Sequence, residues 1–275
     1  APHLPEVDLA SVMAQVRATA ERVYSYETPE RLRQRGVDVH FGEAGFIDPH
    51  TVQCGDKRIT ARKVVIATGA RPVVPDIPGL LAIPFVTYAD IFYVEHLPRR
   101  LVVLGAGAIG VELGQAFQRL GSDVTIFEGQ DRALPIADPE ASAAVARCLE
   151  NEGVRLRLGI AVEKAVRLGN RVAVVAGGVE HEADLVLVAA GRRPEFAGLA
   201  LDRVGVELSG PTIKVNTRLQ TSVKSIYAAG DVASLIQFTH YAGYQGYAAA
   251  RNALFPGRVR GARMGVPWLV FTDPE

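Results

Sequence analysis

Glycines 105, 107 and 110 form a GxGxxG cluster near the middle of the 275-residue chain. A short apolar run, 101–104, precedes the cluster, and good helix formers follow it over 108–120. In a strand–turn–helix arrangement the first glycine permits a tight turn, the second lets a pyrophosphate approach the backbone, and the third lets helix and strand pack closely. The helix N-terminus then presents unpaired N–H groups to the phosphates. This pattern predicts a dinucleotide-binding site.

An acidic residue, Glu128, follows the next strand-like run and lies 23 residues after Gly105 (128 − 105). At that position a carboxylate can accept hydrogen bonds from the ribose 2′-OH, which favours NAD(H). NADP(H) stays open as the alternative, because a 2′-phosphate needs a cation and Arg132 is the nearest basic residue. A third interpretation is a plain turn followed by a solvated strand-end carboxylate.

The surrounding pattern indicates the elements that must position this site. We predict helices over 7–26, 29–34, 108–120 and 138–153, and strands over 37–41, 63–68, 101–104, 123–127, 155–158, 171–175 and 184–189. The proline-rich stretch Arg71–Gly79 reads as an extended connector. From residue 98 onward the alternation is typical of an α/β domain with a largely parallel sheet.

Composition excludes several classes of protein. Thirty basic and thirty acidic residues cancel, so we expect no nucleic-acid partner. The longest apolar stretches are far shorter than a membrane span, and no signal-peptide pattern is visible, so we predict a cytoplasmic protein with no membrane partner. Cys54 and Cys148 are too few for a disulfide scaffold and too far apart for a CxxC-type redox pair.

Five segments together carry a resemblance to one family. They are Ala67–Pro72 with Ile77–Gly79, Gly105–Glu112, Ala190–Pro194, Thr221–Asp231 and Phe271–Glu275. In order and spacing the whole chain resembles the central part of the pyridine-nucleotide flavin disulfide oxidoreductases, which include dihydrolipoamide dehydrogenase, mercuric reductase and glutathione reductase. The resemblance implies an α/β fold with a Rossmann-like NAD-binding domain inserted in an incomplete FAD-binding α/β domain. We expect residues 1–89 and 216–275 to form the partial FAD-binding domain, the latter range including the start of an interface domain, and residues 90–215 to form the NAD-binding domain.

The resemblance also implies roles for individual positions. The expected NAD(H) residues are Gly105, Ala106, Gly107, Ala108, Ile109 and Gly110 at the pyrophosphate, Glu112 near the nicotinamide–flavin junction, Glu128 at the adenosine ribose, Val162 on the adenine side and Gly191 close to the nicotinamide. The expected FAD residues are Ala44, Thr68 and Gly69 beside the cofactor, Asp231 at the ribityl chain, and Gln237, Phe238, Thr239 and His240 facing the flavin ring. His240 is expected to be a helix-start residue rather than a general base. We expect no catalytic residue and no metal site in this chain.

The sequence also departs from the family pattern. It holds no second GxGxxG for FAD and no CxxxxC redox pair, and it stops at Glu275, where the family's C-terminal interface domain should begin. We therefore expect an excised central portion of a longer protein that dimerises through the absent domain. Without the FAD pyrophosphate turn, the chain itself should hold FAD weakly or not at all.

Two functions stay open at this stage, and both involve small-molecule dinucleotides. The parent protein would be a flavin-dependent oxidoreductase that passes a hydride from NADH through FAD to a disulfide or other acceptor. The isolated chain would be a non-catalytic dinucleotide-binding module. The acceptor is undetermined, because Glu128 is typical of the dihydrolipoamide dehydrogenase or soluble transhydrogenase branches, whereas 238–245 look more like the mercuric reductase branch.

Overall fold

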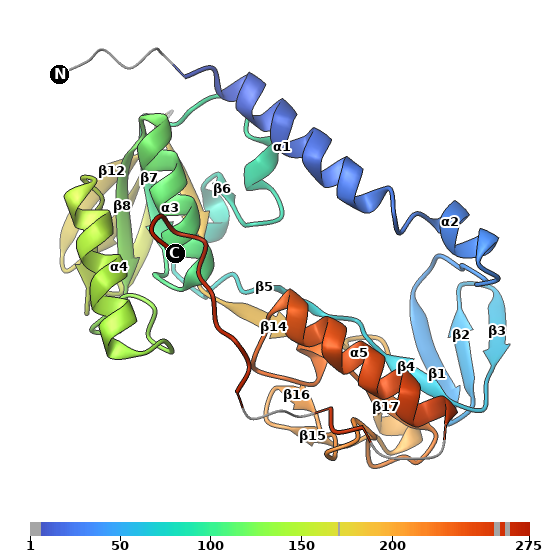
Figure 1. Cartoon of the computed structure of the whole chain (residues 1–275). Helices are drawn as coiled ribbons and strands as arrows, with labels where there is room; N and C mark the ends of the chain where they lie inside the picture. Colours follow the sequence, from blue (N-terminus) through green and yellow to red (C-terminus); the bar gives the residue numbers. More distant parts are fainter. Residues whose placement is uncertain (1–6, 170, 256–258, 262–264) are drawn as a thin grey trace. The chain divides into compact units, whose positions relative to one another are not determined.

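The computed structural model describes residues 7–169, 171–255, 259–261 and 265–275. Its helices are α1 (Leu9–Tyr24), α2 (Pro29–Gln34), α3 (Ala108–Leu120), α4 (Pro139–Asn151) and α5 (Thr239–Leu254) (Figure 1). Its strands are β1 (Ala44–Asp48), β2 (Thr51–Cys54), β3 (Lys57–Thr60), β4 (Val64–Ile66), β5 (Ala70–Pro72), β6 (Phe85–Val86), β7 (Arg100–Leu104), β8 (Asp123–Glu128), β9 (Arg155–Leu158), β10 (Val162–Leu168), β11 (Arg171–Ala176), β12 (Val179–Ala183), β13 (Leu185–Val188), β14 (Arg192–Pro194), β15 (Leu208–Ser209), β16 (Thr212–Ile213) and β17 (Ile226–Ala228). Short 3-10 helices lie at Leu80–Ala82, Ile91–Tyr93, Asp202–Val204 and Gly230–Val232.

Internal packing divides the described residues into two compact units. The first holds residues up to Glu27, Pro72–Gly191 and Trp268–Glu275, and the second holds Thr28–Arg71 and Arg192–Pro267. Helix α1 therefore packs with the first unit, where Leu9 and Met13 join a buried core. The cofactor-domain ranges 1–89, 90–215 and 216–275 stay a prediction, because compactness does not show which cofactor a segment binds.

A parallel sheet forms the centre of the first unit, in the order β6–β13–β7–β8–β9. Leu101 pairs with Val124 and Leu104 with Phe127, so the prediction that these two runs are neighbouring parallel strands is confirmed. Strand β13 pairs with β7 on its other side, also in parallel. The chain thus proceeds from β7 to β8 and β9 on one side and returns to β13 on the other.

Alternating side chains of the sheet contribute to two cores. On β7, Leu101 and Val103 pack into the core that α1, α3 and α4 cover. Val102 and Leu104 face the opposite core, which the antiparallel strands β10, β11 and β12 cover. This two-residue period is what a pleated strand buried on both faces requires. The first unit is therefore a three-layer structure, with the parallel sheet as its middle layer.

The sequence pattern predicted β11 as a strand but did not show that it belongs to a different sheet from β9 and β13. Of the three runs predicted after α4, 155–158 and 184–189 join the parallel sheet as β9 and β13, but 171–175 forms the middle of the separate β10–β11–β12 sheet. Gly177 and Gly178 both adopt positive φ, at 59° and 73°, and turn the chain back from β11 into β12. Glycine favours this conformation because it has no Cβ.

The helices that flank the sheet begin and end where their terminal residues predict. Asp138 caps α4 by accepting a hydrogen bond from the Glu140 amide, and Pro139 occupies the first turn. Gly121 ends α3 in a left-handed conformation, with φ 110°. Within the described residues no helix combines the length and apolar character needed to cross a bilayer.

The second unit contains small sheets and one long helix. Strands β1, β2 and β3 form an antiparallel meander, β4 pairs with β17 in parallel, β15 pairs with β16, and β5 pairs with β14. The buried carbonyl oxygen of Gln245 on α5 accepts a hydrogen bond from the Gly230 amide at 2.8 Å, which ties the helix to the turn after β17. This contact fixes the loop that holds Asp231.

The predicted strand over 37–41 is wrong. No strand forms there, and Val37 donates its amide to Leu32 at the end of α2. Val37 and Phe41 are 47% and 76% exposed, so the alternating apolar side chains do not face a core. The alternation of apolar residues is present in the sequence, but no neighbouring strand pairs with this run and its apolar side chains stay exposed.

Candidate functional site

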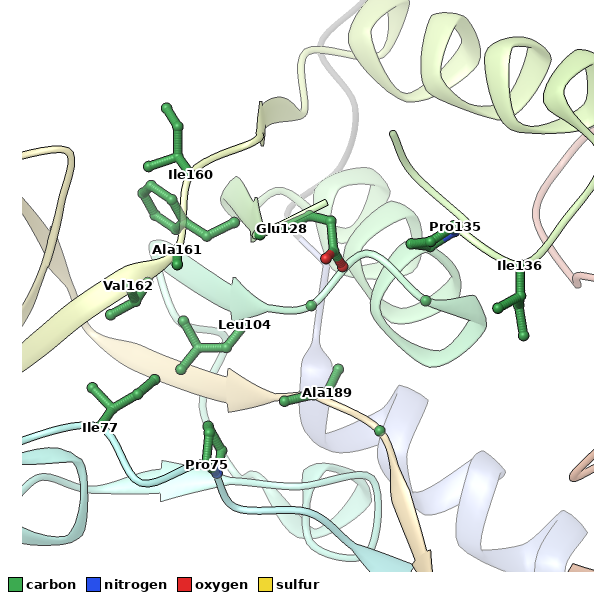
Figure 2. A pocket seen from close by; sticks show the side chains of 16 residues that line it. Pro75, Ile77, Leu104, Glu128, Pro135, Ile136, Ile160, Ala161, Val162 and Ala189 are labelled. Carbon is green, nitrogen blue, oxygen red and sulfur yellow. The ribbon is translucent and has the colours of Figure 1, made fainter. Parts of the chain in front are cut away.

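A cavity of about 600 Å³ opens in the first unit at the carboxyl end of the parallel sheet (Figure 2). The loops that follow β7, β8, β9 and β13 supply most of its wall. Its lining residues are Pro75, Ile77, Leu104, Gly105, Gly107, Phe127, Glu128, Gly129, Pro135, Ile136, Ile160, Ala161, Val162, Ala189, Ala190 and Gly191. Because the strand order reverses at β7, the cavity lies at the topological switch point where α/β sheets bind ligands.

The glycine turn after β7 needs glycine at two positions for packing. A Cβ at Gly105 would lie 2.5 Å from the Ala189 carbonyl oxygen, and φ there is 107°. A Cβ at Gly110 would lie 2.0 Å from the Gly105 carbonyl oxygen. Both contacts are with backbone, which cannot move aside as a side chain can. These two glycines therefore bring α3, β7 and β13 close together.

Gly107 is different because a Cβ there would meet no atom within 4 Å. It lines the cavity and is the N-cap residue of α3, with no side-chain hydrogen bond capping the helix. Its φ of −71° is open to any residue. The space beside Gly107 thus adjoins a helix N-terminus, which favours an anionic group.

The carboxylate of Glu128 is held in place by backbone amides. Oε2 accepts from Ala106 at 2.8 Å, and Oε1 accepts from Gln130 at 2.9 Å. Figure 2 shows the carboxylate pointing toward the turn that follows β7. A carboxylate offers about four acceptor positions, so two amide donors leave room for further hydrogen bonds.

Arg132, the cation considered for a 2′-phosphate, is turned to its own loop. Its Nη2 donates to the Pro135 carbonyl at 2.6 Å, and Arg132 does not line the cavity. The loop is itself fixed on the glycine turn, because the Leu134 amide donates to the Ala106 carbonyl at 2.8 Å. The geometry around Glu128 thus presents an anionic group to the cavity.

Apolar side chains line the remaining wall, and sequence reasoning missed most of them. Ile160 and Ala161 directly precede the predicted Val162, and Pro135 and Ile136 lie on the other side of Glu128 (Figure 2). Ile136 is 76% exposed despite its apolar side chain. A partly apolar wall with few polar groups is typical of a small-molecule site. In the sequence, the signal for part of this wall was the proline-rich connector that holds Pro75 and Ile77.

Half of the ten expected NAD(H) residues line this cavity. Gly105, Gly107, Glu128, Val162 and Gly191 line it, whereas Ala106, Ala108, Ile109, Gly110 and Glu112 do not. Ala106 is buried in the turn, and Gly110 is buried in the first turn of α3. Glu112 is half-buried on α3, where it accepts a hydrogen bond from the Phe271 amide at 2.9 Å. Burial raises the pKa of Glu112, and the amide hydrogen bond opposes that rise.

The expected FAD residues all lie in the second unit, and three of them line a smaller cavity of about 270 Å³. Its lining includes Gly69, Asp231 and Thr239. Asp231 is 8% exposed and forms an ion pair with Arg192 at 2.8 Å. Arg192 also lines the cavity, and sequence reasoning passed over it although it belongs to the matched segment Ala190–Pro194.

The remaining FAD candidates do not line that cavity. The Thr68 hydroxyl donates to the Glu195 carbonyl, and Ala44 lies on β1 beside a different hollow of the second unit. Gln237 and Phe238 precede α5, and His240 lies in its first turn. The His240 ring stacks on Phe238 with centroids 5.4 Å apart, and its Nε2 lies 2.9 Å from the Pro267 carbonyl oxygen.

Comparisons with known proteins agree on one family. A family model described as pyridine nucleotide-disulphide oxidoreductase matches residues 6–246. The mercuric reductase of Staphylococcus aureus is 36% identical over 273 residues, which cover 98% of this chain and 50% of that protein. The dihydrolipoyl dehydrogenase of Pseudomonas aeruginosa is 35% identical over 279 residues, which cover 98% of this chain and 59% of that protein.

A solved structure shows the same fold. The HOCl-induced flavoprotein disulfide reductase RclA from Escherichia coli superposes with a TM-score of 0.90 at 30% identity, over 98% of this chain and 63% of that chain. The chain thus spans about half the length of the curated relatives it matches.

Proposed function

We propose that this chain, which belongs to the pyridine nucleotide-disulphide oxidoreductase family, binds NAD(H) in the cavity of its first unit. Members of the family bind FAD and NAD(P)H. The observation that carries the choice of NAD(H) is the Glu128 carboxylate, which two backbone amides hold at the edge of the cavity. Its unused acceptor positions suit ribose hydroxyls, and its charge opposes a 2′-phosphate.

The other residues of the cavity fit a dinucleotide. The open space at Gly107 and the uncapped N-terminus of α3 suit a pyrophosphate. The apolar wall at Ile160, Ala161 and Val162 suits an adenine ring, and Gly191 at the end of β13 would lie on the nicotinamide side. The anionic pyrophosphate would thus meet the N-terminus of α3, and the apolar adenine ring would meet apolar side chains.

Within the longer relatives this role would be one half of a redox reaction. A bound nicotinamide supplies a hydride and FAD accepts it. The first unit of this chain would hold the adenosine half and the pyrophosphate, and so orient the nicotinamide. In the second unit, Gly69, Asp231 and Thr239 would contribute to holding FAD. From FAD the electrons would pass to a disulfide or another acceptor.

A second candidate is a dinucleotide-binding module without redox activity of its own. The two cysteines favour it for the 275-residue chain. Cys54 and Cys148 are free and belong to different units, and neither has a second thiol in its own unit. Disulfide exchange needs a thiolate and a partner within bonding distance.

Calorimetric titration of the chain with NADH and NADPH tests the proposal. We expect NADH to bind at least about 30-fold more tightly, because like charges brought together cost several kcal/mol. Glu128→Ala should weaken NADH binding by about 10- to 100-fold and narrow the gap to NADPH. Glu128→Gln keeps an acceptor without the charge, so it should lose less NADH affinity than Glu128→Ala and should also admit NADPH better.

The matched control is Glu150→Ala, which removes an exposed carboxylate from α4 of the same unit, away from the cavity. It should leave both affinities unchanged. Equal affinities for NADH and NADPH in the unmodified chain would rule out the assignment of Glu128.

A further inference from the structure

Gln115 forms a reciprocal pair of hydrogen bonds with the backbone of the segment Trp268–Glu275. Its Nε2 donates to the Asp273 carbonyl at 2.8 Å, and its Oε1 accepts from the Asp273 amide at 2.8 Å. The side chain lies on α3 and is only 3% exposed. A buried primary amide that matches both groups of one peptide residue fixes the position of that residue.

Neighbouring side chains complete this contact. Nε2 of Gln115 also donates to Glu152 at 3.0 Å, and Arg119 binds both Glu152 and Asp273. Among the described residues, 268–275 contain no helix or strand, so Gln115 and Arg119 of α3 supply to Asp273 the hydrogen bonds that a neighbouring strand would otherwise supply. Thr272 is 2% exposed within this contact.

The same segment reaches Glu112, one helical turn before Gln115. The Phe271 amide donates to Glu112 Oε1 at 2.9 Å, although the Phe271 side chain is 69% exposed. Residues three apart on a helix share a face, so α3 binds the segment at two points in line. Fixing Asp273 therefore also fixes the amide that Glu112 accepts.

We propose that Gln115 is a positioning residue for Glu112. By anchoring Asp273 it holds the Phe271 amide against the Glu112 carboxylate, and Glu112 held in this way positions the nicotinamide half of the ligand. The second part rests on the proposed NAD(H) function, in which Glu112 lies near the nicotinamide. Gln115 itself touches no ligand. Its effect passes through the 268–275 segment.

Hydrogen exchange of the ligand-free chain tests the anchoring directly. Gln115→Met keeps the volume and removes the amide, so the Phe271 and Asp273 amides should exchange about 10- to 30-fold faster, as expected when two hydrogen bonds are lost. Gln118→Met is the matched control. Gln118 lies on the same helix, but its Oε1 accepts from the Val124 amide at 3.0 Å, on β8. It should leave both exchange rates unchanged.

A double-mutant cycle tests the link to Glu112. Glu112→Ala should speed exchange at Phe271 alone, and adding Gln115→Met should then accelerate Phe271 much less than it does in the unmodified chain. Additive effects at Phe271 would overturn the proposal, since they would mean that Gln115 does not act through this hydrogen bond. Unchanged exchange at Phe271 in Gln115→Met would overturn it as well.

Ligand binding tests the functional part. We expect Gln115→Met to weaken NADH binding about three- to tenfold and to change ADP-ribose binding less than twofold, because only NADH carries a nicotinamide. An equal loss for the two ligands, or none for either, would refute the positioning of the nicotinamide half. Failure of the unmodified chain to bind either ligand would refute the proposed function, while the exchange cycle would still decide whether Gln115 positions Glu112.

Discussion

Adding one methyl group at Gly107 or at Gly110 should separate ligand binding from folding in the glycine turn. Gly107→Ala should fold almost normally and bind NADH poorly. Gly110→Ala should lose stability first. The difference follows from what each new Cβ would meet, which is open space at Gly107 and the Gly105 carbonyl oxygen at 2.0 Å at Gly110.

The magnitudes follow from these contacts. At Gly110 the neighbour is backbone, so the turn or helix must shift, which costs about 1–3 kcal/mol or more and outweighs the roughly 1 kcal/mol that alanine gains over glycine in a helix. At Gly107 the backbone angles suit alanine, and the poorer N-cap costs about 1 kcal/mol or less. The methyl group would nevertheless occupy the space that a pyrophosphate needs, so NADH affinity should fall at least about tenfold.

The assay pairs urea unfolding with NADH titration for each variant. Gly114→Ala is the control for a glycine within α3. Its Cβ would meet the Ile126 Cδ1 atom at 2.7 Å, which is the end of a side chain that can move. It should lose clearly less stability than Gly110→Ala and keep its NADH affinity. Wild-type NADH affinity in Gly107→Ala, or wild-type stability in Gly110→Ala, would show that the turn does not divide its roles in this way.

Three further predictions concern charge and thiol chemistry. Hydrogen bonds from Arg100 lower the pKa of the Asp184 carboxyl below its ordinary value of 3.8. The ionised carboxylate therefore stabilises the fold at pH values above 3.8, and this stabilisation is lost as the pH falls through the lowered pKa. The urea midpoint of Arg100→Met should therefore lie below wild type at pH 7, with the gap closing in acid; a gap that widens in acid would contradict the assigned sign. The pure chain should not reduce lipoamide or glutathione disulfide with NADH, because Cys54 and Cys148 are unpaired thiols in different units; measurable turnover would refute this. Burial raises the pKa of Cys148, so its alkylation at pH 8 should be slower than that of a free thiol.

The turn and the strands beside it could be predicted because their signals are local. An apolar run, three glycines at fixed spacing and a helix that stops at Gly121 specify β7 and α3 within a few residues. The position of Glu128 at the end of β8 followed from the length of this strand–helix–strand segment. Each of these signals acts over one turn or one strand, which is the range in which sequence periodicity has physical meaning.

The long-range pairings could not be predicted in the same way. The run Val172–Ala176 is buried throughout, and a continuous apolar strand suits either a parallel core or a packed antiparallel layer. The run 37–41 alternates as a strand would, but no neighbouring strand pairs with it. In the same way, nothing in Asp273 indicates that Gln115, 158 residues earlier, will bind its backbone. These outcomes depend on which segments meet in the folded chain.

Glu128 shows why ligand recognition and local folding are coupled in this cavity. One of its oxygens holds the Ala106 amide, and the Ala106 carbonyl holds the Leu134 amide, so the carboxylate links the glycine turn to the loop that carries Ile136. Replacing it therefore removes a ligand acceptor and loosens two walls of the cavity together. Glu128→Gln keeps an oxygen that can accept from Ala106, whereas Glu128→Ala does not. The amide nitrogen of Gln would then face the Gln130 amide and could not accept from it, so the loss of NADH affinity in Glu128→Gln reports the lost charge together with one lost hydrogen bond. The further loss in Glu128→Ala measures what the remaining oxygen contributes through the turn.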